Sequence, residues 1–194
     1  MRNLFGLARP GLPLLSLLGL SCVPPGALAH EIDISINEDA FRSVFALALK
    51  DSLRLEGGVL HNSDEGDVIS AGFLVTGDAA PAGEKLTAGI GARLAYLDGD
   101  GSQRDGYAVG VGGSVRWVLP RNERFALSAE GYWAPEVLCG EDAEEYLDGT
   151  VRFGYSVTRQ ADVYVGARYT RANYNNRPST LFDTGMNIGF TLRF

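Results

Sequence analysis

The feature that most constrains this chain is an alternation of two residue classes that continues to its last residue. In the final segment one face carries Phe182, Thr184, Met186, Ile188, Phe190, Leu192 and Phe194, and the other carries Asp183, Gly185, Asn187, Gly189, Thr191 and Arg193. Because side chains of a strand point alternately to its two faces, this period predicts β-structure. Comparable segments recur, separated by turn residues, at 32–36, 41–49, 53–61, 69–75, 85–96, 107–119, 125–133, 147–157 and 163–170.

Charge follows the same two phases. The apolar phase of these segments contains no Asp, Glu, Lys or Arg, and the other phase contains 14: Glu31, Asp33, Arg42, Arg54, Glu56, Lys85, Arg93, Arg116, Glu130, Asp148, Arg152, Arg168, Asp183 and Arg193. A soluble sandwich also alternates, but glycine is unusual on its solvent face because it weakens strands. Here the polar phase mixes Gly and Ala with charges, which suits the interior of a small closed barrel. We therefore predict an all-β, antiparallel up-and-down transmembrane β-barrel.

Aromatic residues of the apolar phase form two groups when the chain is traced back and forth from Phe194. One end receives Trp117, Phe125, Tyr155 and Phe194, and the other receives Tyr96, Tyr107, Trp133, Tyr169 and Phe182. Two aromatic belts that bound an apolar band are typical of a bilayer-spanning barrel. Short connections at 50–51, 120–122 and 159–160 are expected on the periplasmic side, and longer ones at 98–104, 135–144 and 174–180 outside the cell.

The number of strands follows from the segment count. Both termini of such a barrel are expected on the periplasmic side, so the number is even. Ten strands are favoured, and eight is the alternative if the two weakest N-terminal segments are not part of the wall. A barrel of either size has an interior that side chains fill. The six acidic and eight basic inward residues predict a paired charge network rather than an open channel.

The N-terminus has the organisation of a secretory signal peptide. Arg2 and Arg9 precede the apolar stretch from Leu12 to Leu20, and the small-x-small sequence Ala27-Leu28-Ala29 ends it. The stretch is too short for a membrane helix, which needs roughly 20 apolar residues. We predict a cleaved signal peptide at 1–29 and a single outer-membrane barrel domain at 30–194. Lipidation at Cys22 is disfavoured, since Gly19 occupies a position that a lipobox fills with a large aliphatic residue.

Cleavage changes the charge and the cysteine content. The net charge of −7 becomes −9, because two of the 17 basic residues are lost while all 24 acidic residues remain. So acidic a chain argues against nucleic acid as a partner. Cys139 is left without a second cysteine, so no intramolecular disulfide can form, and we interpret it as an unpaired loop thiol. We expect a monomer in the bacterial outer membrane.

Three groups of polar residues are candidate sites. His61 and Ser63 resemble the histidine–serine pair of lipid A deacylases, where histidine activates serine, but no third residue is defined and a hairpin loop explains them better. The segment Asp98 to Ser102 hints at a calcium loop but has Gln103 and Val109 where glycine and glutamate are needed. We predict no catalytic, cofactor or metal site. The surplus acids of the outer loops suggest weak Ca²⁺ or Mg²⁺ bridging to lipopolysaccharide, which with the membrane lipids is the expected partner.

Four stretches resemble the YfaZ family of predicted outer-membrane proteins: Gly106–Trp117, Glu130–Glu136, Ala161–Tyr169 and Phe182–Phe194. The resemblance implies an outer-membrane barrel, sometimes labelled porin-like, and carries over no catalytic residue. A last strand that ends in phenylalanine, here Phe194, also resembles the signal read by the outer-membrane insertion machinery. The expected function is a structural, surface-interaction or narrow porin-like role without enzymatic activity. The alternative is a lipid A-modifying hydrolase that uses His61 and Ser63.

Overall fold

The computed structural model describes residues 30–50, 52–81, 84–99, 105–175 and 178–194. The predicted signal peptide at 1–29 lies outside these ranges and stays a prediction. The elements of the described part are β1 (His30–Ile36), β2 (Ala40–Lys50), β3 (Leu53–Asn62), β4 (Gly66–Asp78), β5 (Lys85–Gly99), β6 (Asp105–Val118), β7 (Phe125–Ala134), the short 3-10 turn η1 (Glu136–Leu138), β8 (Cys139–Glu141), β9 (Ala143–Ser156), β10 (Ala161–Tyr174) and β11 (Thr180–Arg193).

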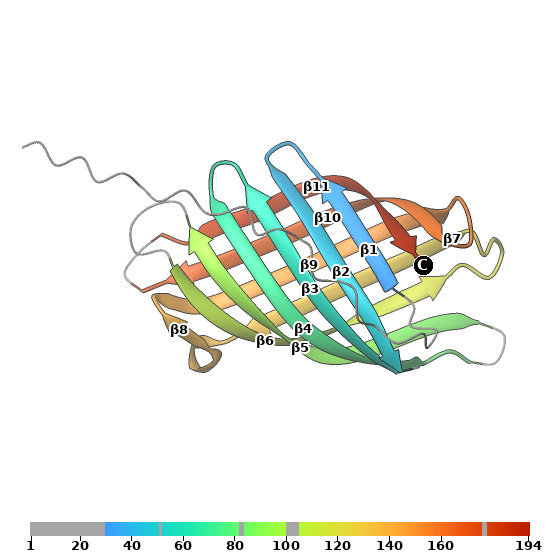
Figure 1. Ribbon diagram of the computed structural model, residues 1–194, viewed down its shortest axis with the longest axis horizontal. Helices are drawn as coiled ribbons and strands as arrows, with labels where there is room; N and C mark the ends of the chain where they lie inside the picture. The colour runs from blue at the N-terminus through green and yellow to red at the C-terminus, as the bar shows by residue number, and fades with distance from the viewer. Residues whose placement is uncertain (1–29, 51, 82–83, 100–104, 176–177) are drawn as a thin grey trace, which may run out of the picture.

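Ten of these strands form one closed ring (Figure 1). The strand order is β5-β4-β3-β2-β1-β11-β10-β9-β7-β6, and β5 pairs with β6 to complete it. Every pairing is antiparallel, and the first strand closes on the last through the register Glu31↔Arg193 to Ile36↔Ile188. A ring pairs the backbone groups that an open sheet edge would leave unsatisfied in hydrocarbon, at several kcal/mol each. The prediction of a ten-stranded up-and-down barrel is confirmed, and the eight-stranded alternative is wrong.

Both ends of the described chain meet at one end of the barrel, which we call the terminal end. The amide of His30 donates to the carbonyl oxygen of Phe194 at 2.8 Å, and the amide of Phe194 donates to the carbonyl oxygen of His30 at 2.9 Å. The opposite end, which we call the far end, carries the last residues of β1, β3, β5, β7 and β10, together with β8. In Figure 1 the terminal end lies to the right, and the far end to the left.

The two phases of the alternation face opposite sides of the wall. On β5, Ile90 and Leu94 face outward with 76% and 51% of their surface exposed, whereas Arg93 and Ala95 face inward with 3% and 0% exposed. The other strands repeat this pattern, so exposed apolar side chains surround the barrel on all sides. A protein in water rarely exposes such an extensive apolar surface, which is the surface a bilayer covers. Within the described residues, no helix is both long and apolar enough to cross a membrane.

The aromatic belts are confirmed with one exception. Tyr96, Tyr107 and Trp133 are exposed by 47%, 46% and 52% near the far end. Phe182, predicted to face outward beside them, is instead fully buried inside the barrel. The reason is a β-bulge: Thr170 pairs with Asp183 and the next residue pairs with Leu181, so Phe182 is skipped in the ladder. The extra residue exchanges the two faces, and Leu181 takes the outward position.

The predicted loop at 135–144 is more ordered than expected. Strand β7 ends at Ala134, and the chain then makes the turn η1 before β8 pairs with Gly106–Ala108 of β6. Strand β8 therefore continues the wall beside β6 beyond the end of β7. Strand β9 also begins inside the predicted loop, at Ala143. Apolar alternation could not reveal a strand of three residues, because such a segment is too short for a period to show.

Candidate functional site: the lumen of the barrel

The lumen at the far end is filled by packed apolar side chains. Tyr146, Phe182 and Leu97 are exposed by 2% or less. They belong to one cluster whose other buried members are Ala40, Leu60, Val68, Ala95, Ala108, Ala134, Ala143, Ala172 and Tyr174. We call this cluster the far-end core. It combines six alanines with three large rings, so large and small side chains from nearly all strands pack together inside the barrel.

A charged layer lies next to the far-end core, centred on Arg93. Its Nη2 donates to Glu56 Oε2 at 2.9 Å and to Glu130 Oε1 at 2.6 Å, and its Nη1 donates to Asp148 Oδ2 at 2.7 Å. The guanidinium also lies over the ring of Tyr132, 4.0 Å from its centroid. One side chain of β5 thus connects β3, β7 and β9 across the lumen. The planar fork of arginine allows several such bonds at once, which the single ammonium of lysine would not reproduce.

Two further groups of hydrogen-bonded polar side chains connect the first strand, β1, to the last strands of the chain. Asp33 of β1 accepts hydrogen bonds from Arg152 at 3.1 Å, from the Tyr164 hydroxyl at 2.8 Å and from the Thr191 hydroxyl at 2.7 Å. These donors belong to β9, β10 and β11. A buried carboxylate is stable where its oxygens accept this many hydrogen bonds. The seam between β1 and β11 is therefore held from within as well as by the backbone ladder.

A second group sits where β11 continues past the end of β1. Arg168 donates to Asp183 at 2.5 Å and to the hydroxyl of Ser35, and Asn37 in the turn after β1 donates to the other oxygen of Asp183 at 2.5 Å. Arg168 and Asp183 are exposed by 3% and 1%. The paired charge network predicted from the sequence is therefore present. Lys85 is the exception, because its ammonium lies at the rim and pairs with Glu123 at 2.7 Å, with 62% of the side chain exposed.

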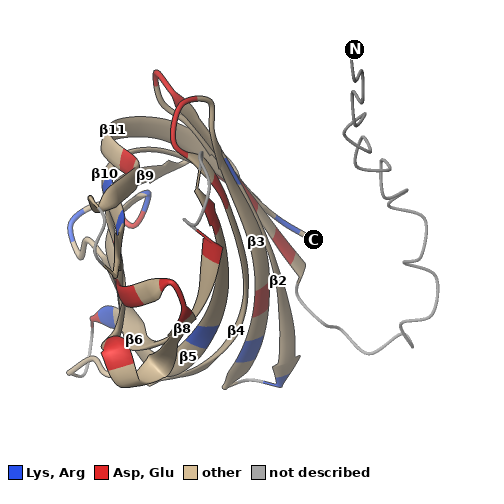
Figure 2. Cartoon of the chain, turned by 90° about the vertical axis from the view of Figure 1, so that its left-hand side faces the viewer, with Lys and Arg blue, Asp and Glu red and all other residues tan. Residues whose placement is uncertain are grey.

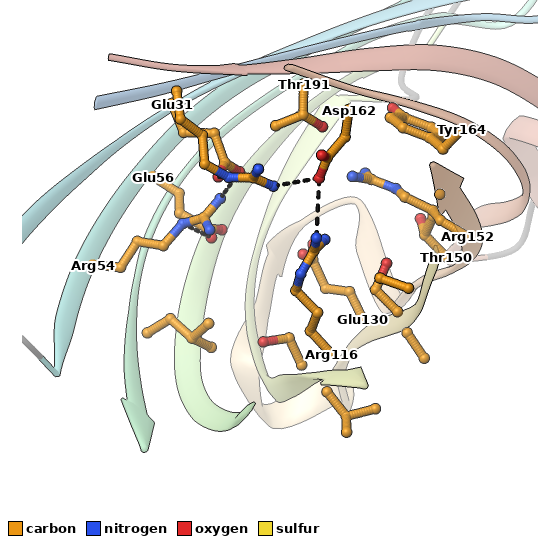
Figure 3. Close-up of a pocket in the computed structure, with 18 residues that line it drawn as sticks. Glu31, Arg54, Glu56, Arg116, Glu130, Thr150, Arg152, Asp162, Tyr164 and Thr191 are labelled. Carbon is orange, nitrogen blue, oxygen red and sulfur yellow. Dashed lines mark hydrogen bonds and ion pairs between the residues drawn. The ribbon is translucent and has the colours of Figure 1, made fainter. Parts of the chain in front are cut away.

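The terminal end of the lumen holds a cavity of about 180 Å³ (Figure 3). Its charged lining includes four arginines and four carboxylates: Arg54, Arg116, Arg152, Arg193, Glu31, Glu56, Glu130 and Asp162. Arg116 and Arg193 both bind Asp162 Oδ2, at 3.0 Å and 2.7 Å. A much smaller space of about 10 Å³ is lined by Arg42, by Asp148 of the charged layer and by Tyr146 of the far-end core. It holds at most about one water molecule.

The structure does not assemble the hydrolase site considered from the sequence. His61 Nδ1 lies 2.6 Å from Asp67 Oδ1, its neighbour across the β3–β4 hairpin, and both side chains are exposed. Asp67 is a carboxylate partner that the sequence did not single out. Among the described hydrogen bonds, however, none joins His61 to Ser63, whose amide donates to the carbonyl oxygen of Asp39. Activation of a serine requires that missing contact.

The other candidate sites lie at the far end. Of the segment Asp98 to Ser102, the last three residues fall outside the described ranges. Within the described residues, no three His, Cys, Asp or Glu side chains lie close enough together to hold a metal ion. Cys139 is half-buried beside the far-end core, and its Sγ lies 3.6 Å from the carbonyl oxygen of Ala134. Burial and the nearby Glu145 carboxylate raise the pKa of the Cys139 thiol.

Sequence reasoning missed one inward charge that the cavity uses. Asp162 is the second residue of β10 and pairs in register with Ser156 and Thr191, and it faces the lumen with 5% of its surface exposed. The predicted strand began one residue later, at Val163. Had the alternation been extended by one residue, Asp162 would have fallen in the inward phase.

A closed ring of ten antiparallel strands, with apolar side chains outside and paired charges inside, defines an integral outer-membrane β-barrel protein. Figure 2 shows the barrel from its far end, with its charged positions coloured. The family model described as "YfaZ precursor" matches residues 11–194, and the chain belongs to the YfaZ family.

Individual relatives agree with this assignment. Outer membrane protein YfaZ of Escherichia coli (strain K12) is 29% identical over 143 residues, which span 71% of this chain and 75% of the relative. The outer-membrane location predicted from the sequence is confirmed. Two solved structures are similar in part. A chain from work on the in-meso crystallization of membrane proteins has a TM-score of 0.45 at 9% identity. The match covers 86% of this chain and 83% of the other chain. OccK5 (OpdH) of Pseudomonas aeruginosa has a TM-score of 0.25 at 12% identity, covering 84% and 63%.

Proposed function

We propose that this protein is a non-catalytic, structural outer-membrane barrel whose lumen is sealed at the far end and open as a blind chamber at the terminal end. The observation that carries the proposal is the far-end core, in which Tyr146, Phe182 and Leu97 pack across the lumen with 2% or less of their surface exposed. Water and ions need a continuous polar path to cross a barrel, and close-packed apolar side chains interrupt it.

The charged layer supports the same function. Arg93 joins three acids from three strands, and Arg42 and Arg54 also pair with these acids, so the charges are paired within the lumen rather than displayed along a channel. A network of this kind holds the strands of the wall in a fixed arrangement. Because its charges bind each other, they do not form a row of free charged groups along which a solute could pass. The narrow porin-like role considered from the sequence is therefore the less supported choice.

Orientation follows from the termini. In barrels of this class the termini lie in the periplasm, so the chamber at the terminal end faces the periplasm and the far end faces outward. The acids at the far end include Asp64, Glu65, Asp98, Asp105 and Glu141. We propose that they bind lipopolysaccharide weakly through divalent cations. The ring closes within one chain, which supports a monomer.

A swelling assay of proteoliposomes tests the proposed seal. Liposomes that contain the refolded chain 30–194 should respond to small sugars and amino acids as protein-free liposomes do. A matched sample with a known porin reports that the assay works. Rapid swelling with the refolded chain, at a fraction of folded protein verified by heat modifiability, would contradict the sealed lumen.

A further inference from the structure

The terminal-end cavity has one arginine that its acidic partners neutralise incompletely. Arg54 pairs with both Glu31 at 2.9 Å and Glu56 at 3.0 Å, and Arg193 pairs with both Glu31 at 3.1 Å and Asp162 at 2.7 Å. Arg116 pairs with Asp162 alone among the described residues, at 3.0 Å. Since Arg193 shares that same carboxylate oxygen, Arg116 retains much of its positive charge.

Arg116 is also the most accessible arginine of the ion pairs that the structure describes. Its side chain is 40% exposed, compared with 32% for Arg54, 19% for Arg152 and 3% for Arg93. The side chain of Arg116 on β6 points into the lumen. Its exposed surface therefore borders the cavity rather than the lipid. Figure 3 shows Arg116 rising from the cavity wall toward Asp162.

The deeper acids do not compete for this charge. Glu56 and Glu130 also border the cavity, but both are bonded to Arg93, at 2.9 Å and 2.6 Å. Glu130 has Arg42 as a second cation at 3.6 Å. The charged lining as a whole balances, with four arginines against four carboxylates, so the positive character is local to Arg116, which shares one carboxylate oxygen with Arg193.

Hydroxyl groups line the wall beside Arg116. Ser128 of β7 is its direct partner in register, and Ser114 lies two residues earlier on the same face of β6. A serine hydroxyl can donate one hydrogen bond to an anion, and a guanidinium can donate two in parallel to a carboxylate or phosphate. These three side chains therefore offer donors from two adjacent strands on one wall of the cavity.

We propose that this wall, formed by Arg116, Ser128 and Ser114, binds a small oxyanion that enters from the periplasm and bears a carboxylate or phosphate group. A volume of about 180 Å³ suits a small ligand, because sites for drug-sized molecules measure about 300–1,000 Å³. The site goes beyond the proposed structural function and does not depend on the seal at the far end. A conducting barrel could have it as well.

Thermal unfolding of the refolded chain tests the site, with inorganic phosphate and acetate as probes in separate titrations. Chloride keeps the ionic strength constant, and heat modifiability reports the unfolding midpoint. A ligand that binds the folded barrel raises this midpoint in a saturable way. We expect saturable stabilisation by at least one probe. Phosphate alone would identify a phosphate site, and both would identify a general oxyanion site.

Three variants locate the effect. Arg116→Gln should weaken apparent binding about tenfold or more, the loss expected for a charge-assisted hydrogen bond. Ser128→Ala should weaken it several-fold while keeping every ion pair. Lys85→Gln, which removes a rim cation outside the cavity, should bind as the unaltered chain does. Absence of saturable stabilisation in the unaltered chain would overturn the proposal. It would also be overturned if Arg116→Gln and Ser128→Ala both bound the probe with the affinity of the unaltered chain.

Discussion

His30 and Phe194 bind each other through two reciprocal backbone hydrogen bonds of 2.8 Å and 2.9 Å, and their rings lie 5.7 Å apart. The residue predicted to follow signal cleavage therefore contacts the last residue of the chain. This contact ends the six-residue ladder between β1 and β11, which closes the ring. Closure thus depends on two segments, β1 and β11, that are far apart in the sequence.

We expect removal of the Phe194 side chain to impair assembly more than its modest packing would suggest. Phe194→Ala should lower the fraction of chain recovered as folded barrel in outer membranes, because the aromatic C-terminus is the proposed contact for the insertion machinery. Boiled and unboiled samples on SDS gels measure that fraction. Ile90→Ala, which also shortens an exposed outward side chain, is the control. Equal recovery of the two variants would contradict this role.

Arg93 is expected to be the most costly single charge to remove. Arg93→Met leaves Glu56, Glu130 and Asp148 without their shared partner in the lumen, and breaking a buried ion pair from one side costs about 3–5 kcal/mol. Urea unfolding in lipid vesicles, followed by tryptophan fluorescence, measures the loss.

Two further variants separate charge from geometry in this layer. Arg93→Lys should recover part of the stability, because it restores the charge without the fork of donors. Lys85→Met removes an exposed pair at the rim and should leave the unfolding midpoint unchanged. Arg93→Met with the stability of the unaltered chain would show that the charged layer does not hold the wall together.

The alternation predicted most of this barrel because the bilayer and the lumen impose opposite requirements on successive residues. It identified the ring of ten strands, the outward aromatic residues and the inward charges. It failed where a strand leaves the regular period: the bulge at Phe182 turns an aromatic ring into the lumen, and no local residue pattern marks that bulge. Which charges pair also stayed open, since Arg93 and Asp148 are 55 residues apart in the chain and meet only through the register of the ring.

Cys139 should react slowly with alkylating reagents in the folded protein. It lies at the far end beside the far-end core, in the short strand β8, and burial with the nearby Glu145 raises its thiol pKa. A raised pKa leaves less thiolate at a given pH, and the thiolate is the reactive form. Iodoacetamide at pH 8 should therefore modify the folded chain more slowly than the urea-unfolded chain, and Glu145→Gln should speed the folded reaction. Equal rates in folded and unfolded chain would contradict the shift.

Divalent cations should stabilise the barrel in membranes that contain lipopolysaccharide. The far-end acids and the phosphates of that lipid repel each other unless cations bridge them. EDTA should lower the thermal unfolding midpoint in lipopolysaccharide-containing vesicles and have no effect in phosphatidylcholine vesicles. An unchanged midpoint in the first case would remove cation bridging from the account.

The most direct test of the sealed lumen is single-channel recording in planar bilayers. The refolded chain 30–194 should give no unitary conductance. The double variant Tyr146→Ala with Phe182→Ala, which removes the two largest fully buried side chains of the far-end core, should give small, stable openings once heat modifiability confirms that it is folded. Stable unitary currents from the unaltered chain, equal to those of the double variant, would contradict the seal and establish a pore.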